Sequence, residues 1–213
     1  MRAHSVSDPL GAATARVQFE TPRTVNVPLF RSLIEVLDQD RRWVVLDLGP
    51  ARPQTVALLG RFRCRLDIAD LMLADSLADT DDRVLAGELA AQLGAIQHPE
   101  PTDIALCWDF LNYLEPGQIT TLMRSVAARC RPGALVHALI VYSDRLMQQC
   151  PAQLVPIDEG RLFNRSTAKP ERIAPRYSPE ELCNCMPGFS VERARLLTNG
   201  MQEYLFRFGQ SDD

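Results

Sequence analysis

A carboxylate and a glycine follow an apolar run near the start of the chain. Asp47 lies inside the run from Trp43 to Leu48, and Gly49 comes directly after it. A carboxylate in an apolar strand is costly unless it is hydrogen-bonded, so Asp47 predicts either a structural acid that bonds loop amides or a ligand contact organised through that loop. Ala51 and Pro53 complete the loop. Ala51 adds one methyl group, and Pro53 removes an N–H donor but favours the start of a helix.

A second group of polar and aromatic side chains lies at the end of the run from Ile104 to Phe110 and just after it. The group comprises Trp108, Asp109, Asn112 and Tyr113. Open α/β sheets bind ligands at the carboxyl ends of their strands. Asp109 and Asn112 could orient an acceptor molecule, meaning one that receives a transferred group, or could accept its proton. Trp108 and Tyr113 could line an apolar pocket or simply pack in the core. Tyr142, at the end of the run 134–142, is expected on the same rim.

The elements that must position these residues alternate between strand and helix patterns. Apolar runs predict strands over 43–48, 64–69, 104–110, 134–142, 190–197 and 202–208. Helical spacing, prolines and caps predict helices over 28–37, 53–62, within 70–95, over 116–130 and from 179. This alternation predicts a parallel sheet with helices on both faces. A turn at 198–200 makes the last strand antiparallel, beside the strand 134–142, and no β-branched run before Pro99 supplies the third strand of many α/β folds.

Two segments lack a sustained period. Residues 1–27 are expected to form a mobile or surface-draped lead to a domain over 28–213. Residues 143–176 carry prolines at 151, 156, 170 and 175, and a long irregular segment is typical of a functional lid or a disordered connector. Basic residues (Arg145, Arg161, Arg165, Lys169, Arg172, Arg176) outnumber acidic ones (Asp144, Asp158, Glu159, Glu171) there. We therefore expect a lid over an acceptor that carries negative charge.

In this order and at these spacings, "VVLDLG", "RLDIADLML", "DIALCWDFLNYL" and "LMRSVAARCRPGALVHALI" resemble the class I S-adenosylmethionine-dependent methyltransferases. The closing "YSPEELCNCMPGFSVERARLLTNGMQEYLFRF" resembles the helix and hairpin that end that family's domain, so the likeness spans about Pro28 to Phe208. The resemblance implies a Rossmann-like three-layer α/β sandwich with a mostly parallel sheet and one antiparallel strand near the C-terminus.

The resemblance also implies S-adenosylmethionine as cofactor and a set of contacts. Cofactor contacts are expected from Asp47, Gly49, Ala51, Asp67, Asp70, Trp108 and Asp109. The acid that holds the ribose is Asp67 or Asp70; the family pattern favours Asp67, and the strand length also allows Asp70. Asp109 is the candidate base, and Asn112, Tyr113 and Tyr142 are candidates for binding a small-molecule or protein acceptor.

Two other functions compete with methyl transfer. A non-catalytic protein of the same fold, serving as a binding or regulatory module, is favoured by Ala51, by Pro53 and by the lack of an acid for the adenine amino group. Glu88 and Glu100 are expected to face solvent instead. A nicotinamide-dependent oxidoreductase is disfavoured because the phosphate-binding glycines are missing.

Composition restricts the class of protein further. The 213 residues are 46% hydrophobic and 23% charged, as in a soluble globular domain, and the net charge of -4 argues against nucleic acid. No apolar run is long enough to span a membrane. Six cysteines, partly inside apolar patterns, favour reduced, buried thiols in the cytoplasm. The histidines and the Cys183–Cys185 pair lack metal-ligand spacing, so no metal is expected.

Overall fold

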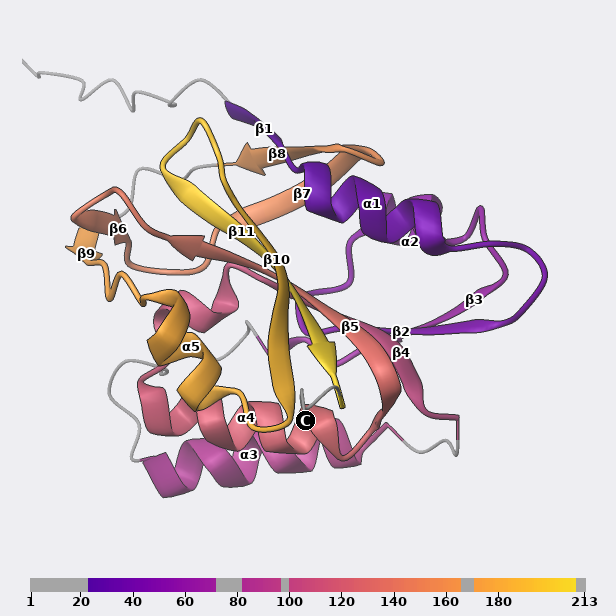
Figure 1. The fold of residues 1–213 in the computed structure, drawn as a ribbon, viewed down its shortest axis with the longest axis horizontal. Helices are drawn as coiled ribbons and strands as arrows, with labels where there is room; N and C mark the ends of the chain where they lie inside the picture. Colours follow the sequence, from indigo (N-terminus) through magenta and orange to yellow (C-terminus); the bar gives the residue numbers. More distant parts are fainter. Residues whose placement is uncertain (1–22, 72–81, 97–99, 166–170, 210–213) are drawn as a thin grey trace, which may run out of the picture.

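The computed structural model describes residues 23–71, 82–96, 100–165 and 171–209. Its centre is a six-stranded sheet in the order β10-β11-β5-β4-β2-β3 (Figure 1). The strands are β2 (Trp43–Asp47), β3 (Cys64–Ile68), β4 (Thr102–Trp108), β5 (Cys130–Val141), β10 (Phe189–Leu196) and β11 (Met201–Phe208). Neighbouring strands from β3 to β5 are parallel, and β11 runs antiparallel to both β5 and β10.

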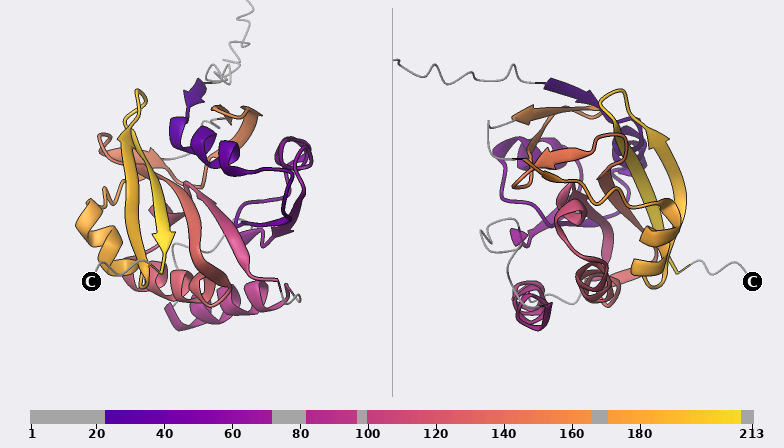
Figure 2. Two further views of the ribbon diagram at one scale, coloured as in Figure 1. Left: turned by 45° about the vertical axis from the view of Figure 1, so that its right-hand side comes forward. Right: turned by 90° about the vertical axis from the view of Figure 1, so that its left-hand side faces the viewer.

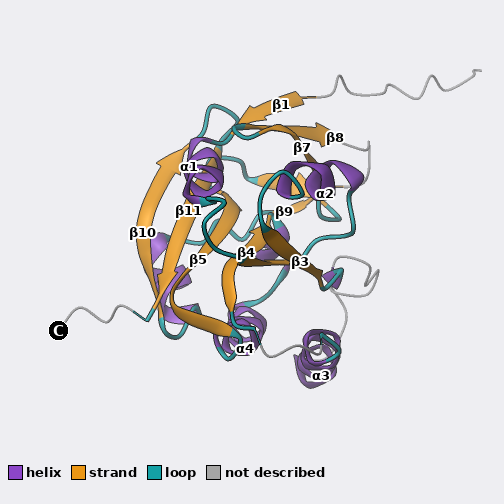
Figure 3. Ribbon diagram, turned by 90° about the vertical axis from the view of Figure 1, so that its right-hand side faces the viewer, coloured by secondary structure: helices purple, strands orange, loops and turns teal. Residues whose placement is uncertain are grey.

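Helices cover both faces of this sheet, as Figure 3 shows. Helices α1 (Pro28–Val36) and α2 (Pro53–Leu59) pack on one face, around Phe30 and Leu59. Helices α3 (Asp82–Gly94), α4 (Pro116–Ala127) and α5 (Pro179–Cys185) pack on the other, around Leu93, Leu122 and Leu182. Every residue of β2 and β4 is buried, because both faces of these central strands are covered. The chain thus forms an α/β protein of three layers.

The segment between β3 and α3 is part of the region in which the third strand of many α/β folds was predicted to be missing. No strand occurs in its described part, and residues 72–81 lie outside the described residues. The absence of a third strand therefore stays a prediction.

The prediction that 143–176 is irregular was wrong. The described part of this segment contains β6 (Leu146–Gln148), β7 (Gln153–Asp158), β8 (Arg161–Arg165) and β9 (Glu171–Ile173). β7 and β8 form a hairpin, and β6 pairs with β9. Pro156 is tolerated inside β7 because β7 is an edge strand, where one side needs no N–H donor.

The expected lead also contains regular structure. Residues 23–26 form β1 (Arg23–Asn26), which pairs antiparallel with β8. Four residues are too few to show a period, and their partner lies far along the chain, so sequence patterning could not reveal this strand. The sheet β1-β8-β7 lies beside α1 and α2 (Figure 1 and Figure 2). Residues 1–22 lie outside the described residues.

A buried carboxylate holds the start of α1. Val27, the residue at the N-cap of this helix, makes no side-chain capping bond. Instead, Glu203 of β11 accepts hydrogen bonds from the backbone N–H groups of Leu29 (3.0 Å) and Phe30 (2.7 Å). Its Oε1 also lies 2.9 Å from Nε2 of His137 on β5. The negative charge at the positive end of the helix ties α1 to the sheet.

Two further observations concern the environment of the protein. All six cysteines are free thiols; Cys107 and Cys185 are buried and Cys183 is exposed, so the expectation of burial holds only in part. In the ranges that the structure describes, no helix combines the length and apolar character that a membrane span requires.

Candidate functional site at the carboxyl edge of the sheet

The predicted acids come together where β2, β3 and β4 end. In the parallel register, Asp47 lies beside Ile68 of β3 on one side and Leu106 of β4 on the other. The backbone continues past β3, because the N–H of Leu71 donates to the carbonyl oxygen of Leu48. Asp47, Asp70 and Asp109 therefore occupy the same edge of the sheet.

Asp47 organises the loop that follows β2. Its side chain is buried, and Oδ1 accepts hydrogen bonds from the Gly49 N–H (2.9 Å) and the Trp108 indole N–H (2.6 Å). Burial raises the pKa of this carboxyl to about 6; the two hydrogen bonds lower it and the charge of Asp70 raises it. The structure thus gives Asp47 the loop-bonding role that the sequence allows.

Gly49 makes room for the Trp108 ring. A Cβ atom at this position would lie 2.9 Å from Cδ1 of Trp108 and 3.2 Å from Oδ1 of Asp47. Ala51 is exposed, and Pro53 is the first residue of α2. The glycine therefore serves close approach of the indole in this conformation, rather than leaving open space above the loop.

The structure separates the two candidates for binding a ribose. Asp67 is mostly buried within β3, and its Oδ1 lies 3.0 Å from Nε of Arg65. Asp70 follows β3 with a φ of 50°, and its Oδ1 is buried without a hydrogen-bond partner in the described part of the chain. Trp108 also has a φ of 50°. Positive φ is uncommon outside glycine and is less well tolerated by tryptophan than by aspartate, and such strain gathers at ligand sites.

Asp109 lies beneath the chain that leads into β7. The backbone N–H of Ala152 donates to its Oδ2 (2.8 Å), while Oδ1 has no partner among the described residues. Burial raises the pKa of this carboxyl to about 7. A carboxyl that titrates near neutral pH can act as a general base if it reaches an acceptor proton.

Asn112 is fully occupied by backbone groups. Its Nδ2 donates to the carbonyl oxygens of Asp109 and Leu139, both at 2.8 Å, and its Oδ1 accepts from the Val141 N–H (2.8 Å). The side chain therefore fastens the turn after β4 to the end of β5. These bonds leave no free donor for a substrate in this conformation.

The two tyrosines that were candidates for acceptor binding differ in exposure. Tyr113 is buried, and its hydroxyl donates to the carbonyl oxygen of Cys150 (2.9 Å). Tyr142 is 43% exposed at the end of β5. Tyr113 thus anchors the segment before β7, and Tyr142 alone of the two faces solvent.

β7 and its preceding residues cover the glycine loop. The space enclosed by Pro50, Arg52, Trp108, Ala152 and Leu154 is about 10 Å³. That volume holds about one water molecule. A larger groove of about 490 Å³ opens between the start of α2 and the β7–β8 hairpin. Its lining includes Ala51, Arg52, Gln54, Gln153, Phe163 and Arg165.

Comparison with known proteins identifies the fold. No protein-family model and no curated protein matches the sequence. An S-adenosylmethionine-dependent methyltransferase from Clostridium acetobutylicum matches over 86% of this chain and 89% of its own, with 11% identity and a TM-score of 0.50. This chain has the class I methyltransferase fold. The resemblance seen in the sequence is confirmed at the level of fold.

Other solved structures with this fold match at similar identity. The 1,6-didemethyltoxoflavin-N1-methyltransferase of Burkholderia thailandensis, solved with 1,6-didemethyltoxoflavin and S-adenosylhomocysteine, is 17% identical; the match covers 85% of this chain and 77% of that chain, with a TM-score of 0.49. The glycopeptide N-methyltransferase MtfA is 15% identical, over 86% of this chain and 87% of that chain, with a TM-score of 0.47.

Two features of this methyltransferase-fold site were missed in the sequence. One is the bond between Trp108 and Asp47, for which a signal exists: a buried indole N–H needs an acceptor and a buried carboxylate needs a donor. The other is the cover formed by β7. Its contacts with Asp109 and Tyr113 are made by backbone groups of Ala152 and Cys150, just before β7, which leave no trace in residue type.

Proposed function

We propose that the chain binds S-adenosylmethionine at the carboxyl edge of β2, β3 and β4 and transfers its methyl group to a small-molecule or protein acceptor. The observation that carries the proposal is Asp70. Asp70 Oδ1 is buried without a partner among the described residues, which costs about 1–3 kcal/mol or more, and a ribose diol placed there would satisfy it with two donors. We assign the ribose to Asp70 rather than Asp67, because Asp67 is already paired with Arg65.

The residues present fit one end of the cofactor and not the other. Asp70 suits the ribose, whereas Trp108 and β7 fill the space above Gly49 where the methionine part would lie. The cover must therefore shift before the cofactor binds, which gives the lid predicted for 143–176 a specific part, the β7–β8 hairpin. A bound S-adenosylmethionine supplies an electrophilic methyl group on sulfur. Asp47 orders the loop of Gly49 and Ala51, and Asp109 Oδ1 is the proposed acceptor of a proton.

The groove beside the cover suggests the acceptor's charge. Arg52 and Arg165 line it together with the apolar side chains of Val155 and Phe163. Guanidinium groups bind carboxylates with paired hydrogen bonds, so an acceptor with a carboxylate and an apolar body suits this surface. Tyr142, on the same rim, stays a candidate contact. The free thiols are in keeping with a cytoplasmic protein.

Calorimetric titration with S-adenosylhomocysteine tests the cofactor proposal without knowledge of the acceptor. Asp70→Asn should weaken binding at least about tenfold, the scale of a lost charge-assisted hydrogen bond. Asp67→Asn is the matched control and should change binding by less than about threefold, since its charge faces Arg65. Equal losses in both variants, or a larger loss for Asp67→Asn, would contradict the assignment to Asp70.

Hydrogen exchange tests the moving cover. Binding of S-adenosylhomocysteine should alter exchange over residues 150–165, including the Ala152 amide that donates to Asp109. Unchanged exchange at saturation would rule out the shift. Methyl transfer itself is tested with methyl-labelled S-adenosylmethionine and a panel of anionic and cationic small molecules, and turnover of only the cationic ones would refute the charge argument.

A second function is favoured by the closed loop. Trp108 and β7 occupy the methionine end, and Ala51 and Pro53 replace two glycines of the family loop. These features suit a non-catalytic protein that keeps the fold as a binding or regulatory module. The absence of any binding heat with both S-adenosylmethionine and S-adenosylhomocysteine would favour this second function over the first.

A further inference from the structure

A groove of about 370 Å³ lies at the other edge of the sheet, where the parallel strands begin. It lies between the end of α1 and the amino ends of β2, β4 and β5. Its lining comprises Ser32, Val36, Arg41, Trp43, Asp103, Arg131, Pro132, Gly133, Ala134, Leu135, Glu192, Arg193 and Arg207. None of these residues belongs to the site built around Asp47, Asp70 and Asp109. The volume is in the range of small-molecule sites.

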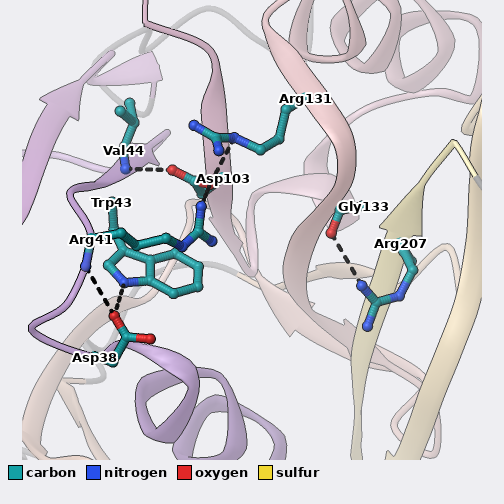
Figure 4. A network of polar contacts seen from close by, with 8 residues as sticks. All are labelled: Asp38, Arg41, Trp43, Val44, Asp103, Arg131, Gly133 and Arg207. Carbon is teal, nitrogen blue, oxygen red and sulfur yellow. Dashed lines mark hydrogen bonds and ion pairs between the residues drawn. The ribbon is translucent and has the colours of Figure 1, made fainter.

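A buried carboxylate fixes two of the arginines. Oδ1 of Asp103 lies 3.0 Å from Nη1 of Arg41 and 2.8 Å from Nε of Arg131, and Oδ2 accepts from the Val44 N–H (2.8 Å). The Asp103 side chain is only 1% exposed, whereas the two arginine side chains are 43% and 37% exposed. Figure 4 shows both guanidinium groups converging on Asp103. Asp103 thus orients them while leaving other N–H groups of each toward the groove.

Arg41 is held by a second contact. Its guanidinium carbon lies 3.4 Å from the centre of the Trp43 ring. The Trp43 indole N–H donates in turn to Oδ1 of Asp38 (3.3 Å), which also accepts from the Arg41 backbone N–H (3.3 Å). A stacked and ion-paired guanidinium has lost much of its rotational freedom before any ligand arrives, which lowers the cost of binding.

The opposite side of the groove carries two more arginines. Arg207 of β11 donates through Nη1 to the Gly133 carbonyl oxygen (3.2 Å), across β5 from Arg131 (Figure 4), and its Nε pairs with Glu192. Arg193 of β10 is exposed and makes no ion pair or side-chain hydrogen bond within the described part of the chain. Among the residues that line the groove, four arginines face two carboxylates, Asp103 and Glu192, which leaves a balance of two positive charges.

We propose that this groove binds a small phosphorylated molecule through the guanidinium groups of Arg41, Arg131, Arg193 and Arg207. A phosphate monoester is close to a dianion at neutral pH, so it matches the uncompensated charge, and its oxygens suit the planar donors of arginine. A monocarboxylate would neutralise only half of that charge. The site lies on the edge opposite the proposed cofactor contacts, so it does not depend on the proposed function.

Titration with inorganic phosphate and with glycerol 3-phosphate tests the site, with sodium chloride adjusted to constant ionic strength. Saturable binding with a dissociation constant of about 1 mM or below is expected. Arg193→Gln should weaken it at least about fivefold, because a charge-assisted bond is lost without breaking any internal contact. Arg41→Gln, which removes the stacked guanidinium, should do the same. Thermal unfolding of each variant verifies that the fold is kept.

Arg195→Gln is the matched control, since Arg195 lies on the same strand and lines a different groove. It should leave phosphate binding within about twofold, as expected for a screened surface charge. The proposal is overturned by non-saturable binding up to about 10 mM, by variants at 41 and 193 that both bind like the unmodified protein, or by equal losses at 193 and 195. Tighter binding of glycerol 3-phosphate assigns the site to an organic phosphate, and equal binding of the two compounds assigns it to free phosphate. Either result supports a phosphate site in this groove.

Discussion

Replacing Asp109 by asparagine is expected to stabilise the protein at alkaline pH and not at acidic pH. Burial holds the Asp109 pKa at about 7, against 3.8 for an unburied aspartate. Because the folded pKa is raised, the folded state keeps its proton between these values while the unfolded chain releases it. The contribution of Asp109 to the free energy of unfolding therefore falls as pH rises from about 4 to about 7, and this loss is complete above pH 7.

The size of the effect follows from the two pKa values. Each pKa unit corresponds to about 1.4 kcal/mol, so the ionised carboxylate destabilises the fold by roughly 4 kcal/mol above pH 7. Asparagine keeps an acceptor for the Ala152 N–H and carries no charge. Allowing for relaxation around the site, we expect Asp109→Asn to gain about 2–4 kcal/mol at pH 8 and less than about 1 kcal/mol at pH 4.5.

Urea unfolding from pH 4.5 to 8, followed by tryptophan fluorescence, measures this difference. The contribution of Asp47, whose pKa is also raised, cancels when the variant is compared with the unmodified protein. Asp158→Asn is the control: the Asp158 side chain is 39% exposed, and its hydrogen bond with Arg161 lowers its pKa. Its stability difference should be flat above pH 5, since its contribution is lost only as pH falls. A difference for Asp109→Asn that does not grow with pH would refute the reasoning.

Three further predictions concern the buried contacts. Glu203→Gln should destabilise the protein by about 1–3 kcal/mol in urea unfolding, because the start of α1 loses a charged acceptor; an unchanged midpoint would contradict this. Gly49→Ala should cost about 1–3 kcal/mol through its clash with Trp108, whereas Gly87→Ala, with open space around it, should be neutral or stabilising. Trp108→Phe should raise the pKa of Asp47, since a hydrogen bond that lowers it is lost; a carboxyl-carbon NMR titration that gives the same pKa would exclude this.

The sequence by itself determined the elements whose signals are local. The apolar runs over 43–48 and 104–110 predicted strands, and the structure has β2 and β4 there, both fully buried. Ser178, Pro179 and Glu181 predicted the start of α5, where Ser178 and Glu181 form reciprocal capping bonds. These features depend on neighbours within a few residues, so residue types and spacing suffice to predict them.

Only the tertiary structure decided which polar groups are paired. Asp67 and Asp70 are three residues apart and chemically identical, and the choice between them rests on Arg65 and on the backbone turn after β3. Asn112 looks like a ligand contact in the sequence, yet backbone groups of distant strands use all of its bonds. Hydrogen-bond partners of this kind depend on where the chain returns to the sheet.

The strand that covers the glycine loop was also decided by the tertiary structure and not by local sequence. Prolines in 143–176 argue against regular structure when read locally, but β7 gains its bonds from β8 on one side and tolerates Pro156 at its open edge. The groove at 41, 103, 131 and 207 joins four separate segments, and the buried Asp103 pairs with the arginines of two of them, Arg41 and Arg131. Pairing between distant segments costs loop entropy and is decided by the whole fold, so a periodic pattern predicts a strand but not what lies against it.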